Sequence, residues 1–327
     1  MGLIGRSLII LVLVAAPAVA QPLVWNLSEE YPASSIPGEG DSAFAALVRD
    51  KSAGRIVVVP KFDAALGYRS KQTLEAVASG AVPLGDMFAG ALGEAEPLFL
   101  LPSLPFLTAS LEEARQLYDA ARPAYEAVLI RHAQKLLFAS LWPPSGIWAR
   151  RTIADEAALR GLRIRTFDVT ATEIFRHLGA APAMISFADA LPRLRAGELD
   201  AVLSSGDGGA GAKLWELLPH FTEINYAMPL SFATIGLAAW DGLPPDLQAA
   251  VGAAAAETEN RQWQAMRGRV TANYERMRAN GVTITSTIDP ALAARLRRAG
   301  AAVVDDWAMK IGADGAAVLA RYRSAKR

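Results

Sequence analysis

The chain has no cysteine and only three histidines among its 327 residues. The lack of cysteine excludes disulfide bonds, thiolate metal sites and a lipid-modified cysteine. His132, His177 and His220 are too far apart in the sequence to show metal-ligand spacing. Basic and acidic residues balance at 33 each, so nothing in the charge favours nucleic acid or an anionic membrane surface. We therefore expect no nucleic-acid partner, no metal and no cofactor.

Long apolar runs are also missing after the first twenty residues. That opening stretch reads MGLIGRSLIILVLVAAPAVA, with Arg6 before an apolar run and a small-x-small pattern at Ala18–Ala20. The pattern predicts a secretory signal peptide over residues 1–20, cleaved near Ala20, and a periplasmic mature chain beginning at Gln21. The alternative is an uncleaved anchor, but a membrane span needs about 20 apolar residues, which is more than the run offers.

Strand and helix patterns alternate through most of the remaining chain, which favours an α/β fold with helices on both faces of open sheets. Residues 55–62 and 135–142 have the composition of buried strands, and residues 110–133 have helical spacing with an expected break at Pro123. Residues 223–228 also resemble a strand. From Pro245 to about Asn280 the pattern is purely helical, which predicts a helix about 45 Å long. Such a helix is longer than one domain needs, so we expect it to span two.

A glycine-rich stretch, SSGDGGAG, follows a predicted strand. Gly206, Gly208 and Gly211 satisfy G-x-G-x-x-G, but a dinucleotide site also needs an acidic residue at the end of the next strand, and Glu223 stands at its start. The Walker pattern is not met. A plain flexible turn is one alternative. The other, which we favour, is a ligand-facing loop whose backbone N–H groups receive a small anion, assisted by three side chains. These are Ser204, Ser205 and Asp207.

Several stretches, taken in order, resemble the periplasmic substrate-binding proteins of TRAP (tripartite ATP-independent periplasmic) transporters, which take up organic acids. The matching stretches are GRIVVVPKFDAALG, TLEAVASGAVPLG, PLFLLPSLPFL, LRGLRIRTF, LGAAPAMISFADALPRLRAGELDAV and LPPDLQAAV. The resemblance implies a two-lobe clamshell of the periplasmic-binding-protein type, with interleaved lobes and a long helix spanning both. It implies lobe I at residues 21–145 plus 231–270, and lobe II at 146–230 plus 271–327 with C-terminal helices. It also implies a small organic acid as ligand and membrane permease subunits as partners.

The segment GLRIR carries the main candidate for ligand recognition. In the family this strand ends in the arginine that pairs with the substrate carboxylate, and the matching residue is Arg165. The period of two places Leu162 and Ile164 on one face, with Arg163 and Arg165 on the other. Arg165 lies nearer the carboxyl end, where open α/β sheets bind ligands, and a guanidinium can grip a carboxylate with two parallel hydrogen bonds. We interpret Arg163 as a surface residue.

The resemblance implies further contacts, some of which depart from the family pattern. Ser204 stands where an asparagine often touches the ligand, which shifts contact toward Ser205 and Asp207. Phe187 matches a position that stacks on the ligand, and Phe88 one that faces the cleft. Trp148 replaces a second arginine, while Arg150 and Arg151 do not align with it. Tyr31 follows the first strand, where ligand contacts occur; weaker candidates are Tyr68, Arg69 and Tyr226.

These residues predict a pocket with an aromatic wall and a single anion clamp, which favours a monocarboxylate over a C4-dicarboxylate. Two rival classes remain at this point. A type II receptor of an ATP-driven importer shares export and two lobes. An exported hydrolase would need a nucleophile, a base and an orienting acid, yet no G-x-S-x-G elbow is present and the histidines are scattered. We therefore expect a binding protein rather than an enzyme, with a signalling role as a further alternative.

Overall fold

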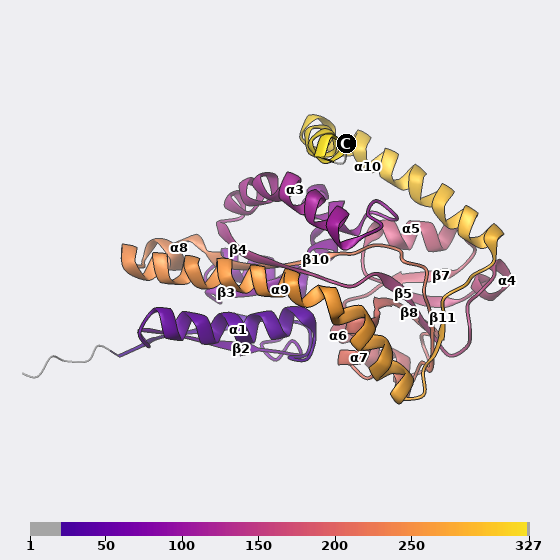
Figure 1. Ribbon diagram of the computed structural model, residues 1–327, viewed down its shortest axis with the longest axis horizontal. Helices are drawn as coiled ribbons and strands as arrows, with labels where there is room; N and C mark the ends of the chain where they lie inside the picture. The colour runs from indigo at the N-terminus through magenta and orange to yellow at the C-terminus, as the bar shows by residue number, and fades with distance from the viewer. Residues whose placement is uncertain (1–20, 326–327) are drawn as a thin grey trace, which may run out of the picture.

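The computed structural model describes residues 21–325, with the side chains of residues 314 and 325 left aside. The predicted signal peptide lies outside this range. Within the described part, no helix is both long and apolar enough to cross a membrane. Two β-sheets organise the chain, and we call the parts built on them the first and the second lobe (Figure 1).

The sheet of the first lobe has the strand order β2-β1-β3-β10-β4. Strand β10 runs antiparallel to both β3 and β4, whereas β1 pairs in parallel with β2 and β3. Strand β10, which lies between β3 and β4, therefore comes from much later in the sequence than the other strands of this sheet. The strands are β1 (Leu23–Ser28), β2 (Ile56–Lys61), β3 (Leu84–Phe88), β4 (Gln134–Leu141) and β10 (Leu230–Gly236).

The sheet of the second lobe has the order β11-β9-β5-β8-β6-β7. Strands β6, β7 and β8 are parallel, and β5 is antiparallel to both of its neighbours. The parallel strands place their carboxyl ends at one edge of the sheet, facing the first lobe. The strands are β5 (Ser145–Ala149), β6 (Arg163–Thr166), β7 (Ala181–Met184), β8 (Ala201–Ser205), β9 (His220–Thr222) and β11 (Thr283–Thr285).

Helices cover the sheets and connect the lobes. The first lobe carries α1 (Ile36–Lys51), α2 (Ser70–Ala78), α3 (Leu111–Arg131) and α8 (Leu237–Asp241). The second carries α4 (Glu156–Leu159), α5 (Val169–His177), α6 (Phe187–Arg195) and α7 (Gly206–Gly211). Two short 3₁₀ segments, Ala89–Leu92 and Pro97–Ser103, follow β3, and a third, Leu214–Glu216, follows α7.

Helix α9 (Pro245–Ala279) confirms the predicted long helix, with 35 residues. It packs against α1 and β4 in the first lobe and against α7 and β11 in the second (Figure 1). Helix α10 (Pro290–Ala325), which bends at Gly312, also touches both lobes, through α3 and α5. The two lobes are therefore interleaved and tied together by helices. The exact residue ranges predicted for the lobes stay a prediction.

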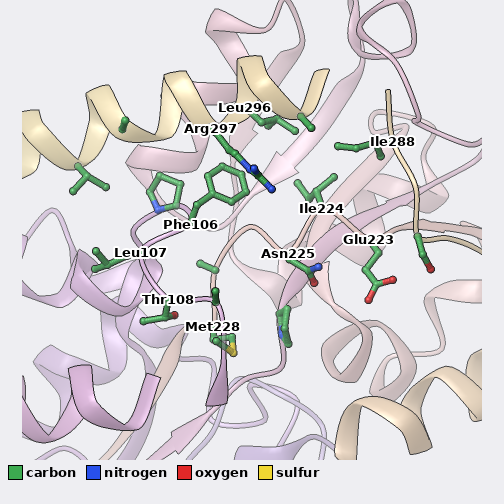
Figure 2. A pocket seen from close by; sticks show the side chains of 18 of the residues that line it. Phe106, Leu107, Thr108, Glu223, Ile224, Asn225, Met228, Ile288, Leu296 and Arg297 are labelled. Carbon is green, nitrogen blue, oxygen red and sulfur yellow. The ribbon is translucent and has the colours of Figure 1, made fainter. Parts of the chain in front are cut away.

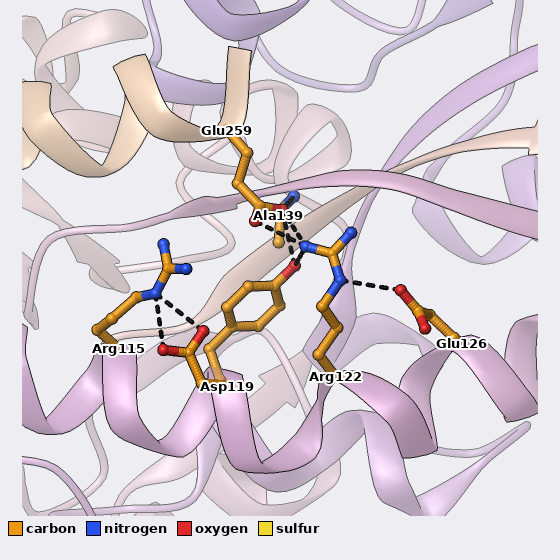
Figure 3. A network of polar contacts seen from close by, with 7 residues as sticks. Arg115, Asp119, Arg122, Glu126, Ala139 and Glu259 are labelled. Carbon is orange, nitrogen blue, oxygen red and sulfur yellow. Dashed lines mark hydrogen bonds and ion pairs between the residues drawn. The ribbon is translucent and has the colours of Figure 1, made fainter. Parts of the chain in front are cut away.

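A buried glutamate fastens α9 to the first lobe (Figure 3). Glu259 accepts hydrogen bonds from Arg122 Nη1 at 2.6 Å, from the Tyr118 hydroxyl at 2.7 Å and from the Ala139 amide at 3.1 Å. These donors come from α3 and β4, so one carboxylate joins three elements. The shared contacts also satisfy a charge that would be costly to bury alone. These bonds attach the first half of α9 to its lobe.

Three local predictions were wrong. The glycine-rich stretch is helix α7 rather than a loop, because it begins directly after β8 with Ser205 capping the Gly208 amide. Helix α3 continues through Pro123, because its buried face stays packed on the lobe core despite the lost backbone hydrogen bond. Residues 223–228 belong to no strand, because the left-handed backbone of Asn225, with a φ of 49°, interrupts the extended run.

Candidate functional site

A cavity of about 210 Å³ lies between the lobes, at the carboxyl ends of their strands. It brings together Tyr31 and Phe88 of the first lobe with Arg165 and Phe187 of the second. A smaller cavity of about 20 Å³ shares Tyr31, Phe88 and Arg165 and adds Ser204 and Ser205. Six of the eight predicted ligand-binding residues thus line these two adjoining spaces, although they come from segments far apart in the sequence.

Arg165 is 3% exposed at the carboxyl half of β6. Its Nε donates to the Ile185 carbonyl at 2.7 Å and its Nη1 to the Leu203 carbonyl at 3.2 Å. These two bonds orient the guanidinium, which carries five N–H donors and so keeps others for a ligand. No acidic side chain forms an ion pair with Arg165 among the described residues. A buried, oriented cation of this kind suits a carboxylate, because burial strengthens the attraction between the charges.

Aromatic rings enclose the cavity around Arg165. Tyr31 stacks on Phe187 across the cleft with ring centroids 4.9 Å apart, and lies 4.7 Å from Trp142. Phe88 and Phe167 meet edge to face at 5.2 Å, and the Arg165 guanidinium lies over the Phe187 ring at 5.5 Å. The rings supply apolar contact area and exclude water. The π face of Phe187 also attracts the positively charged guanidinium of Arg165.

Sequence reasoning missed several residues of this site. Phe167 follows Arg165 by two positions, so the same alternation that selected Arg165 could have found it. Trp142 comes just after β4, and Ser145 begins β5 beside Ser205. Glu30 was passed over beside Tyr31, yet it is buried and lines the cavity. No short-range pattern marks Trp142 or Ser145, because their place depends on how the two sheets face each other.

Polar contacts join the lobes at the edge of the cavity. Arg69, at the start of α2, donates to Asp189 of α6, with Nη2 and Oδ1 2.7 Å apart. The hydrogen bond from Arg69 lowers the pKa of the Asp189 carboxyl. Glu30 accepts from the Ser70 amide and hydroxyl through Oε2, and from the Ala188 amide of α6 through Oε1. These contacts hold the two lobes together around the cavity.

Trp148 and Asp207 do not take the predicted positions, because neither lines either cavity between the lobes. Trp148 is fully buried in the second lobe and donates from Nε1 to the Ser205 carbonyl at 3.1 Å. The Asp207 carboxylate accepts from the Ile36 amide and from Asn273, and pairs with Arg269 of α9. All its contacts are thus within the protein, and its role is to bind α7 to α9 and to the start of α1.

The weaker candidates also lie mostly outside the site. Tyr226 is buried and packs against Phe106, Phe167 and Phe175, while Tyr68 packs beside α2. Arg150 and Arg151 donate to main-chain carbonyls of the second lobe. Arg163 is a surface residue paired with Asp200 at 2.6 Å, in line with its interpretation. Of this group only Arg69 lines the cavity.

A larger cavity of about 860 Å³ lies elsewhere, between α10, residues 105–109 and residues 223–228. Figure 2 shows Arg297 projecting from α10 toward Phe106 and Ile224 in this space. Arg297 is exposed, so solvent screens its charge, and Glu223 on the opposite side is engaged by the Tyr274 hydroxyl. None of the predicted ligand-binding residues lines this cavity. The smaller space around Arg165 is therefore the better candidate site.

Two lobes that enclose a cavity with one buried arginine and an aromatic wall define a solute receptor of the periplasmic-binding-protein type. Residues 27–310 match the family model described as bacterial extracellular solute-binding protein, family 7. The chain belongs to this family, and it is a TRAP-type receptor for small organic acids rather than an enzyme. The resemblance noted in the sequence is confirmed, and the importer and hydrolase alternatives are not supported.

Three similar proteins illustrate this relationship. The C4-dicarboxylate-binding periplasmic protein DctP of Rhodobacter capsulatus is 26% identical over 266 residues, which cover 78% of this chain and 77% of that protein. DctP7 of Bordetella pertussis, described as an extracytoplasmic receptor binding pyroglutamic acid, is 29% identical with a TM-score of 0.88, covering 92% of this chain and 99% of its own. A marine-metagenome TRAP protein from an unidentified microbe, described as specific for pyroglutamate, is 27% identical with a TM-score of 0.88, covering 93% and 99%.

Proposed function

We propose that this protein captures a small monocarboxylate with a compact, partly apolar body, of which pyroglutamate is the leading example. The observation that carries the proposal is the buried Arg165, which faces a wall of aromatic rings. The carboxylate pairs with Arg165, and the body of the ligand lies against Tyr31, Phe88 and Phe187. In the periplasm the loaded receptor then delivers the ligand to membrane permease subunits.

The charges around the cavity favour one carboxylate over two. Besides Arg165, the basic residues lining the larger of the two spaces are Arg69 and Lys71. Arg69 is paired with Asp189 at 2.7 Å, and Lys71 with Glu94 at 2.7 Å. A second ligand carboxylate would have to displace an existing partner and would also face the buried Glu30. Three pyroglutamate-binding proteins among the similar structures support the same preference.

The position of Glu30 favours a ligand that carries an N–H donor in addition to its carboxylate. Its carboxylate lies within the cavity lining and already accepts from Ser70 and Ala188. A carboxylate has about four lone-pair sites, so it can accept one more N–H from a ligand. A lactam N–H close to a carboxylate is what pyroglutamate presents. Simple apolar acids lack this donor and would bind more weakly.

The test is calorimetric titration of the mature chain with pyroglutamate, a branched monocarboxylate, succinate and malate. At a ligand concentration of 100 times Kd, binding stabilises the protein by about 2.7 kcal/mol, so thermal melts provide an independent readout. We expect binding of pyroglutamate and no binding of the dicarboxylates. Binding of dicarboxylates alone would reject the single-clamp proposal.

A matched pair of variants tests the role of Arg165. Arg165→Lys keeps the charge but loses the planar fork and the two carbonyl contacts, which should weaken binding about tenfold to 100-fold. Arg163→Lys makes the same change two residues away, on the exposed pair with Asp200, and should leave affinity unchanged. Equal affinity of Arg165→Lys and the wild type would show that Arg165 does not hold the ligand.

A further inference from the structure

Three acidic side chains meet inside the first lobe, behind the cavity wall. Glu29 follows β1, Asp41 lies on α1 and Asp86 lies on β3. Each offers a carboxylate oxygen, and these oxygens all lie within 4.8 Å of one another. The three segments are brought together by the pairing of β1 with β3 and by the packing of α1 over the sheet.

The three carboxylates are buried and short of partners. Each side chain is about 1% exposed or less. Both oxygens of Asp41, both oxygens of Asp86 and Oε2 of Glu29 have no hydrogen-bond partner among the described residues. Buried polar atoms are nearly always hydrogen-bonded, because leaving them unpaired in a low-dielectric interior is costly. Asp41 interacts with both other carboxyls, and the Ser231 hydroxyl and the Met87 amide lie beside Asp86. These neighbours leave the five oxygens without a well-formed hydrogen bond, so the cluster needs a bound cation or added protons.

No basic side chain in the described part of the chain supplies this positive charge. Among the described residues, none of the three acids takes part in an ion pair, although fifteen other pairs join acids to basic groups. The charged neighbours that influence Glu29 and Asp41 are themselves acidic. Three like charges so close together repel strongly when buried, so the folded protein needs a bound cation or added protons there.

We propose that Glu29, Asp41 and Asp86 form a buried Ca²⁺ site that supports the ligand cavity. All the donors are carboxylate oxygens, which suit hard cations and not the thiophilic or imidazole-binding metals. Calcium lies 2.3–2.6 Å from its oxygen ligands, so a spread of up to 4.8 Å between donors fits around one ion. Magnesium usually keeps several waters, which a pocket of fully buried oxygens does not readily admit.

The site adjoins the ligand cavity through one short segment. Glu29 Oε1 accepts from the Tyr31 amide at 2.5 Å, and Glu30 and Tyr31 both line the cavity. Asp86 stands two positions before Phe88 on β3, on the same face of the strand. A cation at this point would hold the backbone that presents Tyr31 and Phe88. The sequence analysis predicted no metal because it looked for histidine and cysteine spacing, and these acids share no spacing pattern.

The experiment uses the mature chain, residues 21–327, dialysed against a chelator and then titrated with Ca²⁺, Mg²⁺ or Na⁺. Calorimetry gives the stoichiometry, and thermal melts give the shift in Tm. At about 100 times Kd, Ca²⁺ should raise Tm by roughly 4 °C in a chain of this size. Asp41→Asn removes one donor charge and should abolish both the calorimetric signal and the shift. Asp50→Asn, an exposed position on the same helix, should keep both.

One Ca²⁺ bound per chain, lost in Asp41→Asn and kept in Asp50→Asn, supports the site. The proposal is overturned if the wild type shows neither a calorimetric signal nor a Tm shift with any of the three cations, since the carboxyls then hold protons instead. Binding of Mg²⁺ or Na⁺ without Ca²⁺ overturns the choice of ion. Ca²⁺ binding that survives in Asp41→Asn places the ion elsewhere. If Asp41→Asn fails to fold, metal analysis of the purified wild type decides by the presence or absence of one Ca²⁺ per chain.

Discussion

Arg69 and Asp189 form an ion pair that spans the cleft between the lobes. Arg69 stands at the start of α2 in the first lobe, and Asp189 lies in the first turn of α6 in the second. Both Nε and Nη2 of the guanidinium donate to Asp189 Oδ1, at 3.2 and 2.7 Å. Because the two residues line the cavity, their contact depends on the same approach of the lobes that encloses a ligand.

Breaking this pair should weaken ligand binding by a small factor. In Arg69→Gln the closed arrangement loses a half-exposed ion pair worth at most about 1 kcal/mol, so we expect about a twofold to fivefold rise in Kd by calorimetry. Arg163→Gln removes a comparable pair with Asp200 that lies wholly within the second lobe, and it should leave Kd unchanged. The same effect for both variants would mean that the Arg69 pair plays no part in closure.

Gly209→Ala should destabilise the second lobe strongly. An added Cβ at Gly209 would lie only 2.1–2.4 Å from atoms of the Trp148 ring. Because Trp148 is fully buried it cannot move aside cheaply, and overpacking of this kind costs about 3 kcal/mol. Gly252→Ala, two turns into α9 with nothing within 4 Å of the new atom, should instead stabilise by about 0.5–1 kcal/mol. Urea unfolding of both variants measures the difference. Equal stabilities would contradict the close packing.

Local periodicity explains what could be predicted from the sequence. A run of helix-forming residues from Pro245 predicted α9, because apolar spacing and helix propensity act within one segment. Alternation along β6 separated Arg165 from Ile164, and the carboxyl end of the strand indicated which arginine faces the cleft. These features depend on neighbours in the sequence, so a single chain is enough to reveal them.

Features that arise only when distant segments meet could not be predicted in this way. Trp148 looked like a ligand contact, but its ring fills the space left by Gly209, sixty-one positions later. The glycines of α7 suggested a ligand-facing loop, whereas in the structure they allow close packing against β5 and α9. The cluster around Asp41 likewise joins three separate segments, so no motif marks it.

Asp207→Ala should lower stability far more than it lowers affinity. Asp207 is 1% exposed, and its loss would leave the Ile36 amide and the Asn273 side chain without this acceptor, while Arg269 would keep Glu39 as its partner. Leaving a buried donor unsatisfied costs about 1–3 kcal/mol, and two donors are affected here. Asp246→Ala removes an exposed pair with Arg55 and should cost about 1 kcal/mol or less. Urea unfolding and ligand calorimetry on the same samples separate the two effects. A large loss of affinity with little change in unfolding would restore Asp207 as a ligand contact.

Asp168→Asn should change how stability depends on pH. Burial raises the pKa of the Asp168 carboxyl from 3.8 to about 7, despite hydrogen bonds from Ala171 and Thr170 that favour the charged form. The folded state therefore holds this proton up to about pH 7, whereas the unfolded chain releases it near pH 4, so this group destabilises the wild type progressively between those values. Asparagine caps a helix as well as aspartate but does not titrate. The free energy of unfolding of Asp168→Asn, relative to the wild type, should thus be higher at pH 8 than at pH 5.

Asp155→Asn is the control: it makes the same change at the exposed cap of α4, so it reports the effect of the amide on helix capping alone. Urea unfolding at both pH values measures these differences, and an unchanged gap between Asp168→Asn and the wild type would show that Asp168 is charged in the folded state throughout.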